Sequence, residues 1–314
     1  MKKHLIAAAV AGLIAAPAMA QVTVYGNVET GILNTDTDGK PSTTALASSV
    51  VNSSRLGFRG TEDLGGGLKA FFRLEQAVDL STGRLGGQST TSANMFDRGA
   101  EVGLEGSFGS IKVGKFDITN VEGIDNLSQI GNIGLFSGMD IGSDINHAIQ
   151  YKSPSIGGFQ VEIGTALKDG GVNETTSFYV GGKVAGIDLQ VGTTSDKTAA
   201  GIERTQTSMG VRYNFGPLAA TVAYSMLETD GAGDRTQTIV SASAPLGDGL
   251  TVHGMVANFE TKAFGSAKAS KTDKKAIALS NAFSSRTTGY LGYISTDVNG
   301  VETNELYLAV NHRF

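Results

Sequence analysis

The stretch SRLGFRGTEDLGGGLKAFFRLE, residues 54–75, decides the fold class of this chain. The apolar side chains of its second half recur at every other position: Leu68, Ala70, Phe72 and Leu74. Alternation with period two is typical of a β-strand that has one apolar face. The three glycines at 65–67 supply the positive φ angles of a tight turn. The stretch therefore predicts two antiparallel strands joined as a hairpin.

The same alternation recurs along the whole chain and predicts sixteen strands. Short glycine or proline turns between them alternate with longer polar connections, such as 34–50 and 81–96. An even number of strands, with tight turns on one rim and long loops on the other, is the pattern of an outer-membrane β-barrel. The predicted strands are 21–33, 51–62, 68–80, 97–106, 110–117, 146–154, 159–167, 175–185, 187–195, 204–215, 217–229, 235–244, 250–262, 274–283, 287–297 and 302–314.

The composition agrees with an all-β chain. It has 43 Gly and only 5 Pro among 314 residues, and no Cys or Trp. Apolar residues at 40% and charged residues at 18% exclude a disordered chain. The lack of cysteine excludes a disulfide scaffold, a thiolate zinc site and a cysteine nucleophile. A soluble β-sandwich, single or repeated, is the alternative fold, because sandwich strands alternate as well.

Residues 1–20, MKKHLIAAAVAGLIAAPAMA, have the three parts of a secretory signal peptide. Lys2 and Lys3 begin it, an apolar run follows, and Ala18-Met19-Ala20 ends it as a cleavage site. An uncleaved anchor is the alternative, although the run is short for a membrane span. We therefore divide the chain into a signal peptide, 1–20, and a barrel domain, 21–314. Losing the two lysines would take the net charge from −5 to −7.

Four segments, taken in order, carry a family resemblance. Residues 54–75 closely resemble the second hairpin of the general porins of Gram-negative bacteria, and AEVGLEGSFG at 100–109 resembles their next hairpin. IQYKSP at 149–154 resembles the strand after their long third loop, and LYLAVNHRF at 306–314 is similar to their carboxyl terminus. The order and spacing of these segments cover the chain from residue 22 to its end.

This resemblance implies a sixteen-stranded homotrimeric barrel in the outer membrane, surrounded by lipid, with the third loop folded inside. It also implies a water-filled channel through which ions and small hydrophilic solutes diffuse passively, without a cofactor. The terminal strand, ending in Phe314, would be read by the outer-membrane barrel assembly machinery. The simpler interpretation of Phe314 is an aromatic anchor at the membrane interface.

Strand parity predicts which charges line the channel. Arg55 and Arg59 alternate with apolar neighbours, as do Arg73 and Glu75 on the next strand and Glu101 on the one after. A bare arginine on the lipid face near the midplane costs about 2–4 kcal/mol, so these residues are expected to face the lumen. The family resemblance supports a place on the pore wall for Arg55 alone. The alternative to a functional charge cluster is that these polar residues simply hydrate the interior, as in any barrel.

The longest connection, 118–145, is far longer than an ordinary loop, and its apolar residues require something to pack on. We expect it to fold into the barrel, with Glu122 and Asp125 facing the arginines across a constriction. Asp144 stands where the family often has arginine, and GLFSG at 134–138 departs from the usual family turn. These departures leave the ion preference and the shape of the loop tip open.

No motif for catalysis, metal or nucleic acid stands out. GSIKVGK at 109–115 has the spacing of a phosphate-binding loop, but Phe116 follows where serine or threonine is needed. The few histidines form no metal-ligand pair, and no nucleophile elbow or basic stripe occurs. We expect no enzyme activity, metal or cofactor and no nucleic-acid partner. A channel selective for particular anions or sugars, and a secreted β-sandwich adhesin, are the competing functions.

Overall fold

The computed structural model describes residues 21–86, 95–118, 141, 145–167, 174–198, 200–263, 265 and 268–314. No helix in these ranges is long and apolar enough to cross a membrane.

Eighteen strands are described, and most match the predicted strands to within a few residues. They are β1 Gln21–Thr37, β2 Thr43–Ser48, β3 Arg55–Gly65, β4 Leu68–Asp79, β5 Arg84–Leu85, β6 Gly99–Gly106, β7 Gly109–Phe116, β8 Ile145–Lys152, β9 Phe159–Ala166, β10 Glu174–Val184, β11 Ile187–Lys197, β12 Glu203–Phe215, β13 Leu218–Thr229, β14 Arg235–Gly247, β15 Leu250–Thr261, β16 Ser270–Ala282, β17 Thr287–Val298 and β18 Val301–Arg313.

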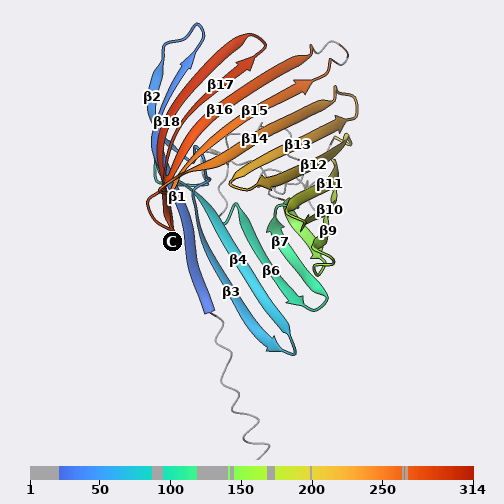
Figure 1. Cartoon of the computed structure of the whole chain (residues 1–314). Coiled ribbons are helices and arrows are strands. Elements are labelled where there is room, and N and C mark those ends of the chain that lie inside the picture. Colours follow the sequence, from blue (N-terminus) through green and yellow to red (C-terminus); the bar gives the residue numbers. More distant parts are fainter. Residues whose placement is uncertain are drawn as a thin grey trace, which may run out of the picture.

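Sixteen of these strands form a closed antiparallel barrel (Figure 1). Each pairs with the next around the ring, and β1 closes it by pairing with β18 from Asn27↔Arg313 to Thr37↔Thr303. The two remaining strands, β2 and β5, are short additions beside β1 and β4. The predicted sixteen-stranded barrel is confirmed. Closure pairs every edge strand and so satisfies the backbone hydrogen bonds in lipid.

The connection at 34–50 differs from the prediction of a plain loop. β1 continues to Thr37 and β2 runs back along it, from Thr35↔Thr43 to Thr30↔Ser48. The first half of β1 pairs instead with β3, from Gln21↔Thr61 to Asn27↔Arg55. One side of β1 thus has two partners in succession. The segment that forms β2 is short and rich in threonine and alanine, so its alternation is too weak to stand out in the sequence.

The glycine turns form one rim, as expected. Gly65, Gly66 and Gly67 all have positive φ, at 84°, 62° and 81°, which L-residues with side chains adopt at a cost. The Asp63 carboxylate accepts a hydrogen bond from the Gly65 N–H at 2.8 Å and fixes the bulge that precedes the turn. Strand ends on the opposite rim are joined by the longer connections, the longest of which separates Phe116 from Ile145.

Candidate functional site

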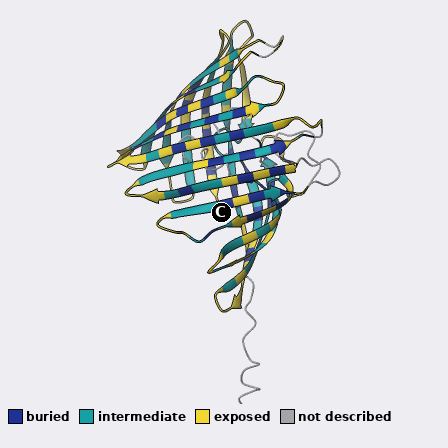
Figure 2. Cartoon of the chain, turned by 90° about the vertical axis from the view of Figure 1, so that its right-hand side faces the viewer, coloured by how far each residue is buried: buried dark blue, intermediate teal, exposed yellow. Residues whose placement is uncertain are grey.

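The two faces of the barrel wall differ in chemistry. Along each strand, buried or half-buried residues alternate with exposed ones, as Figure 2 shows. The exposed positions carry large apolar side chains, such as Val211 and Val222, which pair across β12 and β13. The buried positions between them are largely polar, such as Ser208 and Thr221. The apolar face therefore points to lipid and the polar face to the lumen.

A cluster of charged side chains lies on the lumen face of β1, β3, β4, β6 and β7, together with the turn before β6. We call it the lumen cluster. Its members are Tyr25, Arg55, Arg59, Arg73, Glu75, Arg98, Glu101 and Lys112.

Glu75 is the centre of the lumen cluster, and its side chain is only 5% exposed. It accepts hydrogen bonds from the Tyr25 hydroxyl at 2.7 Å and from Arg98 Nε at 2.9 Å. Nitrogens of Arg55 and Arg73 lie at 3.6 and 3.7 Å from its oxygens. A buried carboxylate is tolerated when it is paired and hydrogen-bonded in this way. The acid thereby holds three guanidinium groups at the wall.

Glu101 forms the second acidic position. It accepts hydrogen bonds from Arg73 Nε at 2.9 Å and from Lys112 Nζ at 3.0 Å. The Lys112 ammonium also lies 4.0 Å from the centre of the Phe116 ring, a cation–π contact. Arg73 therefore bridges the two carboxylates and links β4 to β6.

Glycines make room for this network. Tyr25, Gly57 and Glu75 occupy one cross-strand row, because Gly57 pairs with both of the others. The Tyr25 ring lies across Gly57, where a Cβ would overlap the ring, and its hydroxyl thus reaches Glu75. Gly99 similarly lies under the Arg73 guanidinium. The lack of a side chain at Gly57, on the lumen side of β3, therefore leaves room for the Tyr25 ring.

The lumen cluster has an excess of positive charge. It holds five cationic side chains and two carboxylates, so three positive charges are unbalanced within it. Arg59 contacts no carboxylate among the described residues. Its guanidinium lies 5.0 Å from the centre of the Tyr25 ring and is directly opposite Arg73 on β4. Within the cluster, cationic groups therefore outnumber carboxylates.

The structure brings together five of the predicted site residues: Arg55, Arg59, Arg73, Glu75 and Glu101. Glu122 and Asp125, predicted on the third loop, and Asp144 lie outside the described residues. Three members of the cluster were missed: Tyr25, Arg98 and Lys112. The parity of Lys112, between Ile111 and Val113 on a predicted strand, was a usable signal. Arg98 stands in a turn, where parity carries no information.

A buried carboxylate positions the segment that leads into β3. Glu29 is fully buried and accepts hydrogen bonds from the N–H groups of Val51 at 2.6 Å and Asn52 at 3.0 Å. The Asn52 side-chain amide donates a third, at 2.8 Å. These bonds hold residues 51–52 against the inside of β1, and so fix where Arg55 begins β3.

Two described residues at the ends of the long connection touch the inner wall. Ile118 packs with Phe116, Ala148 and Ala166. Ile141 packs with Leu227, and its N–H donates to the side-chain oxygen of Gln206 at 3.0 Å. Gln206 and Leu227 lie on β12 and β13, well around the ring from β7. Both ends of the connection thus lie inside the barrel.

The wall formed by β13 to β18 has a different character. Its lumen side carries a buried apolar strip and no acidic or basic side chain within that strip. The strip consists of Ala223, Ile239, Met255, Ala257, Ala276, Ala278, Ile294, Tyr307 and Ala309, with Val51 packed on it. This part of the inner wall therefore contains a continuous apolar surface.

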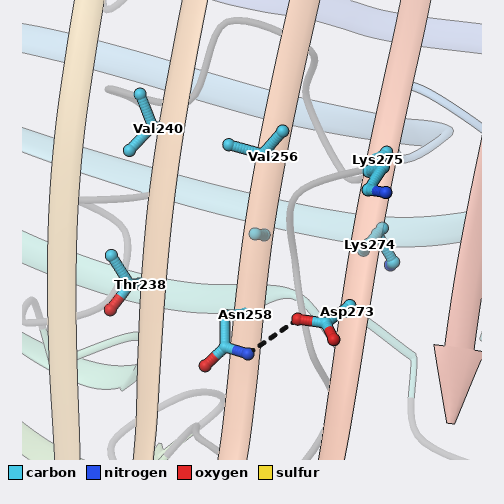
Figure 3. A pocket seen from close by; sticks show the side chains of 8 residues that line it. Thr238, Val240, Val256, Asn258, Asp273, Lys274 and Lys275 are labelled. Carbon is cyan, nitrogen blue, oxygen red and sulfur yellow. Dashed lines mark hydrogen bonds between the residues drawn. The ribbon is translucent and has the colours of Figure 1, made fainter.

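One hollow lies outside the channel. It has a volume of about 380 Å³ and lies on the lipid side of β14, β15 and β16, where Val240 and Val256 are exposed (Figure 3). The Asn258 amide donates to the Asp273 carboxylate at 2.8 Å along its edge. We assign this hollow no part in conduction.

Two kinds of chemical site suggested by the residue types can be compared with the described structure. No group of three or more His, Cys, Asp or Glu among them is placed to hold a metal ion. The glycine-spaced stretch 109–115 forms strand β7, so it does not build the loop and helix that bind a phosphate.

The carboxyl terminus is fastened to β1 on the lipid side. Phe314 and Gly26 exchange backbone hydrogen bonds, each at 3.1 Å. The Phe314 ring covers Gly26, where a Cβ would overlap it. The last residue thus completes the seam at which the barrel closes.

Comparisons with known proteins agree with this architecture. A family model described as Gram-negative porin matches residues 7–301. Outer membrane porin protein 32 of Delftia acidovorans is 34% identical over 295 residues, which cover 85% of this chain and 82% of that protein. The solved structure of an anion-selective porin from Comamonas acidovorans has a TM-score of 0.79 and 26% identity, covering 94% of this chain and 100% of that one. The trimer form of OmpT from Vibrio cholerae shares the fold, with a TM-score of 0.72, 17% identity and coverage of 94% and 99%.

Proposed function

We propose, from the premise that this chain belongs to the Gram-negative porin family, that its channel prefers anions and that the lumen cluster sets this preference. The protein is an integral β-barrel of the Gram-negative outer membrane and forms a porin channel. It acts as a channel rather than as an enzyme. Ions and small hydrophilic solutes pass it by passive diffusion.

The single observation that carries the proposed preference is the unbalanced charge of the lumen cluster. Five cationic groups line one wall around two carboxylates. Rings or walls of Arg and Lys favour anions in a pore, because the field at close range lowers the energy of an anion and raises that of a cation. The likeness to a porin whose title calls it anion-selective supports the same preference.

We further propose that the connection between β7 and β8 narrows the channel. The contacts of Ile118 and Ile141 with the inner wall support a path inside the barrel. The apolar strip on β13 to β18 offers a surface on which the apolar residues of this connection can pack. Glu122 and Asp125 would then face the lumen cluster and create a transverse field.

The finer statements about assembly are also proposals. Residues 1–20 would be removed as a signal peptide, leaving 21–314 as the barrel. The mature chain would form a homotrimer, which the trimeric form of the structurally similar Vibrio protein supports. Assembly machinery in the outer membrane would recognise the last strand through Phe314. We assign no metal, cofactor or nucleic-acid partner.

Replacing Phe314 by alanine is expected to slow assembly and weaken the closing seam. The change uncovers Gly26 and removes an aromatic ring that is about half buried, a loss of about 1 kcal/mol of stabilisation. We expect the yield of folded protein in the outer membrane to fall two- to threefold, measured by heat-modifiable migration of membrane extracts.

Phe314→Tyr retains an aromatic ring and serves as the control, with a yield close to that of the wild type. Equal yields for Phe314→Ala and the wild type would contradict the role assigned to this residue.

Swelling of liposomes that contain the purified protein tests the proposed function. In isosmotic solutions we expect swelling in the neutral sugar arabinose, and faster entry of the monoanion acetate than of similarly sized monocations. The rate is expected to rise linearly with solute concentration. Lack of swelling would contradict a channel. A rate that saturates with one solute alone would indicate the competing substrate-selective channel instead.

A further inference from the structure

A second hollow, of about 220 Å³, lies beside the lumen cluster where β18, β1 and β3 meet. Its lining comprises Tyr25, Gly26, Asn27, Asn52, Arg55 and Arg313. Arg313, Asn27 and Arg55 form a single cross-strand row, because Asn27 pairs with Arg313 on one side and with Arg55 on the other. All three have the parity that faces the lumen.

Arg55 and Arg313 lie on either side of Asn27 in this row. Neighbouring strands are about 4.8 Å apart, so the Cα atoms of Arg313 and Arg55 are about 10 Å apart, within reach of two long side chains that converge. Asn27 between them is fully engaged: its amide donates to the Ser53 carbonyl at 3.0 Å, and its oxygen accepts from Asn311 at 2.7 Å. These two hydrogen bonds fix the floor of the hollow, and the two arginines lie on either side of it.

The two guanidinium groups have one described acidic contact between them. Arg55 has one acidic contact, at 3.6 Å, with a carboxylate that Arg73 and Arg98 also use. Arg313 is exposed, and no acidic partner for it occurs among the described residues. Its backbone N–H donates to the Arg286 carbonyl at 2.9 Å, which places it at the rim of short turns.

We propose that Arg55 and Arg313 together form a second anion subsite, which takes small oxyanions on their way between the lumen cluster and the short-turn rim. The subsite extends the proposed anion preference and rests on it. Guanidinium groups bind carboxylate and phosphate oxygens through two parallel N–H donors, which gives them an advantage for planar or tetrahedral oxyanions over chloride. Arg55 belongs to both sites, so an anion leaving the lumen cluster need not lose all its partners at once.

Block of the chloride current by inorganic phosphate, recorded in planar bilayers, tests the subsite. We expect the phosphate concentration that halves the current to rise about threefold in Arg313→Gln and in Arg55→Gln. The double variant is expected to show little more than the larger single effect, because both groups bind the same ion. Arg313→Lys, which keeps the charge and loses the paired donors, should fall between Arg313→Gln and the wild type.

Arg286→Gln is the matched control, because it removes an exposed arginine from the same rim without touching the hollow. Heat-modifiable migration identifies properly folded variants before recording. Equal phosphate block in Arg313→Gln and Arg286→Gln would overturn the subsite, and so would single effects that multiply in the double variant. A wild-type channel that prefers cations would instead refute the proposed function, which the reversal potential reports separately from the block.

Discussion

Replacing Arg59 by glutamate is expected to reduce the anion-to-cation permeability ratio about tenfold. The change alters the local charge by two units. At about 5 Å in water one unit charge is worth about 0.8 kcal/mol, and 0.1 M salt screens over about 10 Å. Arg59 is suited to this test because its described contacts include the Tyr25 ring and no carboxylate. The introduced carboxylate would lie opposite Arg73, where it replaces a like-charge pair, so the wall is expected to remain folded.

The reversal potential in a KCl gradient measures this effect. Arg59→Gln should give about half the shift, because it removes one unit of charge instead of two. Arg286→Glu makes the same reversal in an exposed turn and is expected to leave the ratio nearly unchanged. A shift of the same size in Arg59→Glu and Arg286→Glu would show that the lumen cluster does not set the preference.

Replacing Val211 by arginine is expected to destabilise the folded barrel by up to about 2–4 kcal/mol, the cost of a cation on the lipid face, which is largest at the midplane. Val211 is 44% exposed, and it pairs with Leu189 and Val222, which lie on the same apolar face. The urea concentration at the midpoint of unfolding in lipid vesicles measures this loss.

Gln190→Arg is the matched control, since Gln190 pairs with Gly210, next to Val211, and faces the lumen. The same charge there can pair with Asp188, with which the Gln190 amide already shares a contact of 3.5 Å. We expect its stability to lie within about 0.5 kcal/mol of the wild type, as for most changes away from buried features. Equal losses for both variants would contradict the assignment of the two faces.

The sequence predicted the strands and their faces well, because both depend on local alternation. Residues 68–75 show this directly: the apolar parity became the lipid face, and Arg73 and Glu75 became part of the lumen wall. Glycine turns such as 65–67 marked the ends of strands for an equally local reason. These features require no knowledge of which strands are neighbours.

The remaining features depend on register, which alternation does not supply. Tyr25 and Glu75 are fifty residues apart and meet only because Gly57 pairs with both and leaves a gap under the ring. Arg98 joins them from a turn. The row formed by Arg313, Asn27 and Arg55 likewise exists only once β1 closes the barrel between the last strand and the third.

The central claim is that this barrel conducts ions and that its lumen cluster favours anions. The most direct test is the zero-current potential of the wild-type protein in a planar bilayer with a tenfold KCl gradient. We predict stepwise conductance and a potential whose sign corresponds to chloride crossing more readily than potassium. A potential of the opposite sign would contradict the anion preference, and a membrane that shows no conductance steps would contradict the channel itself.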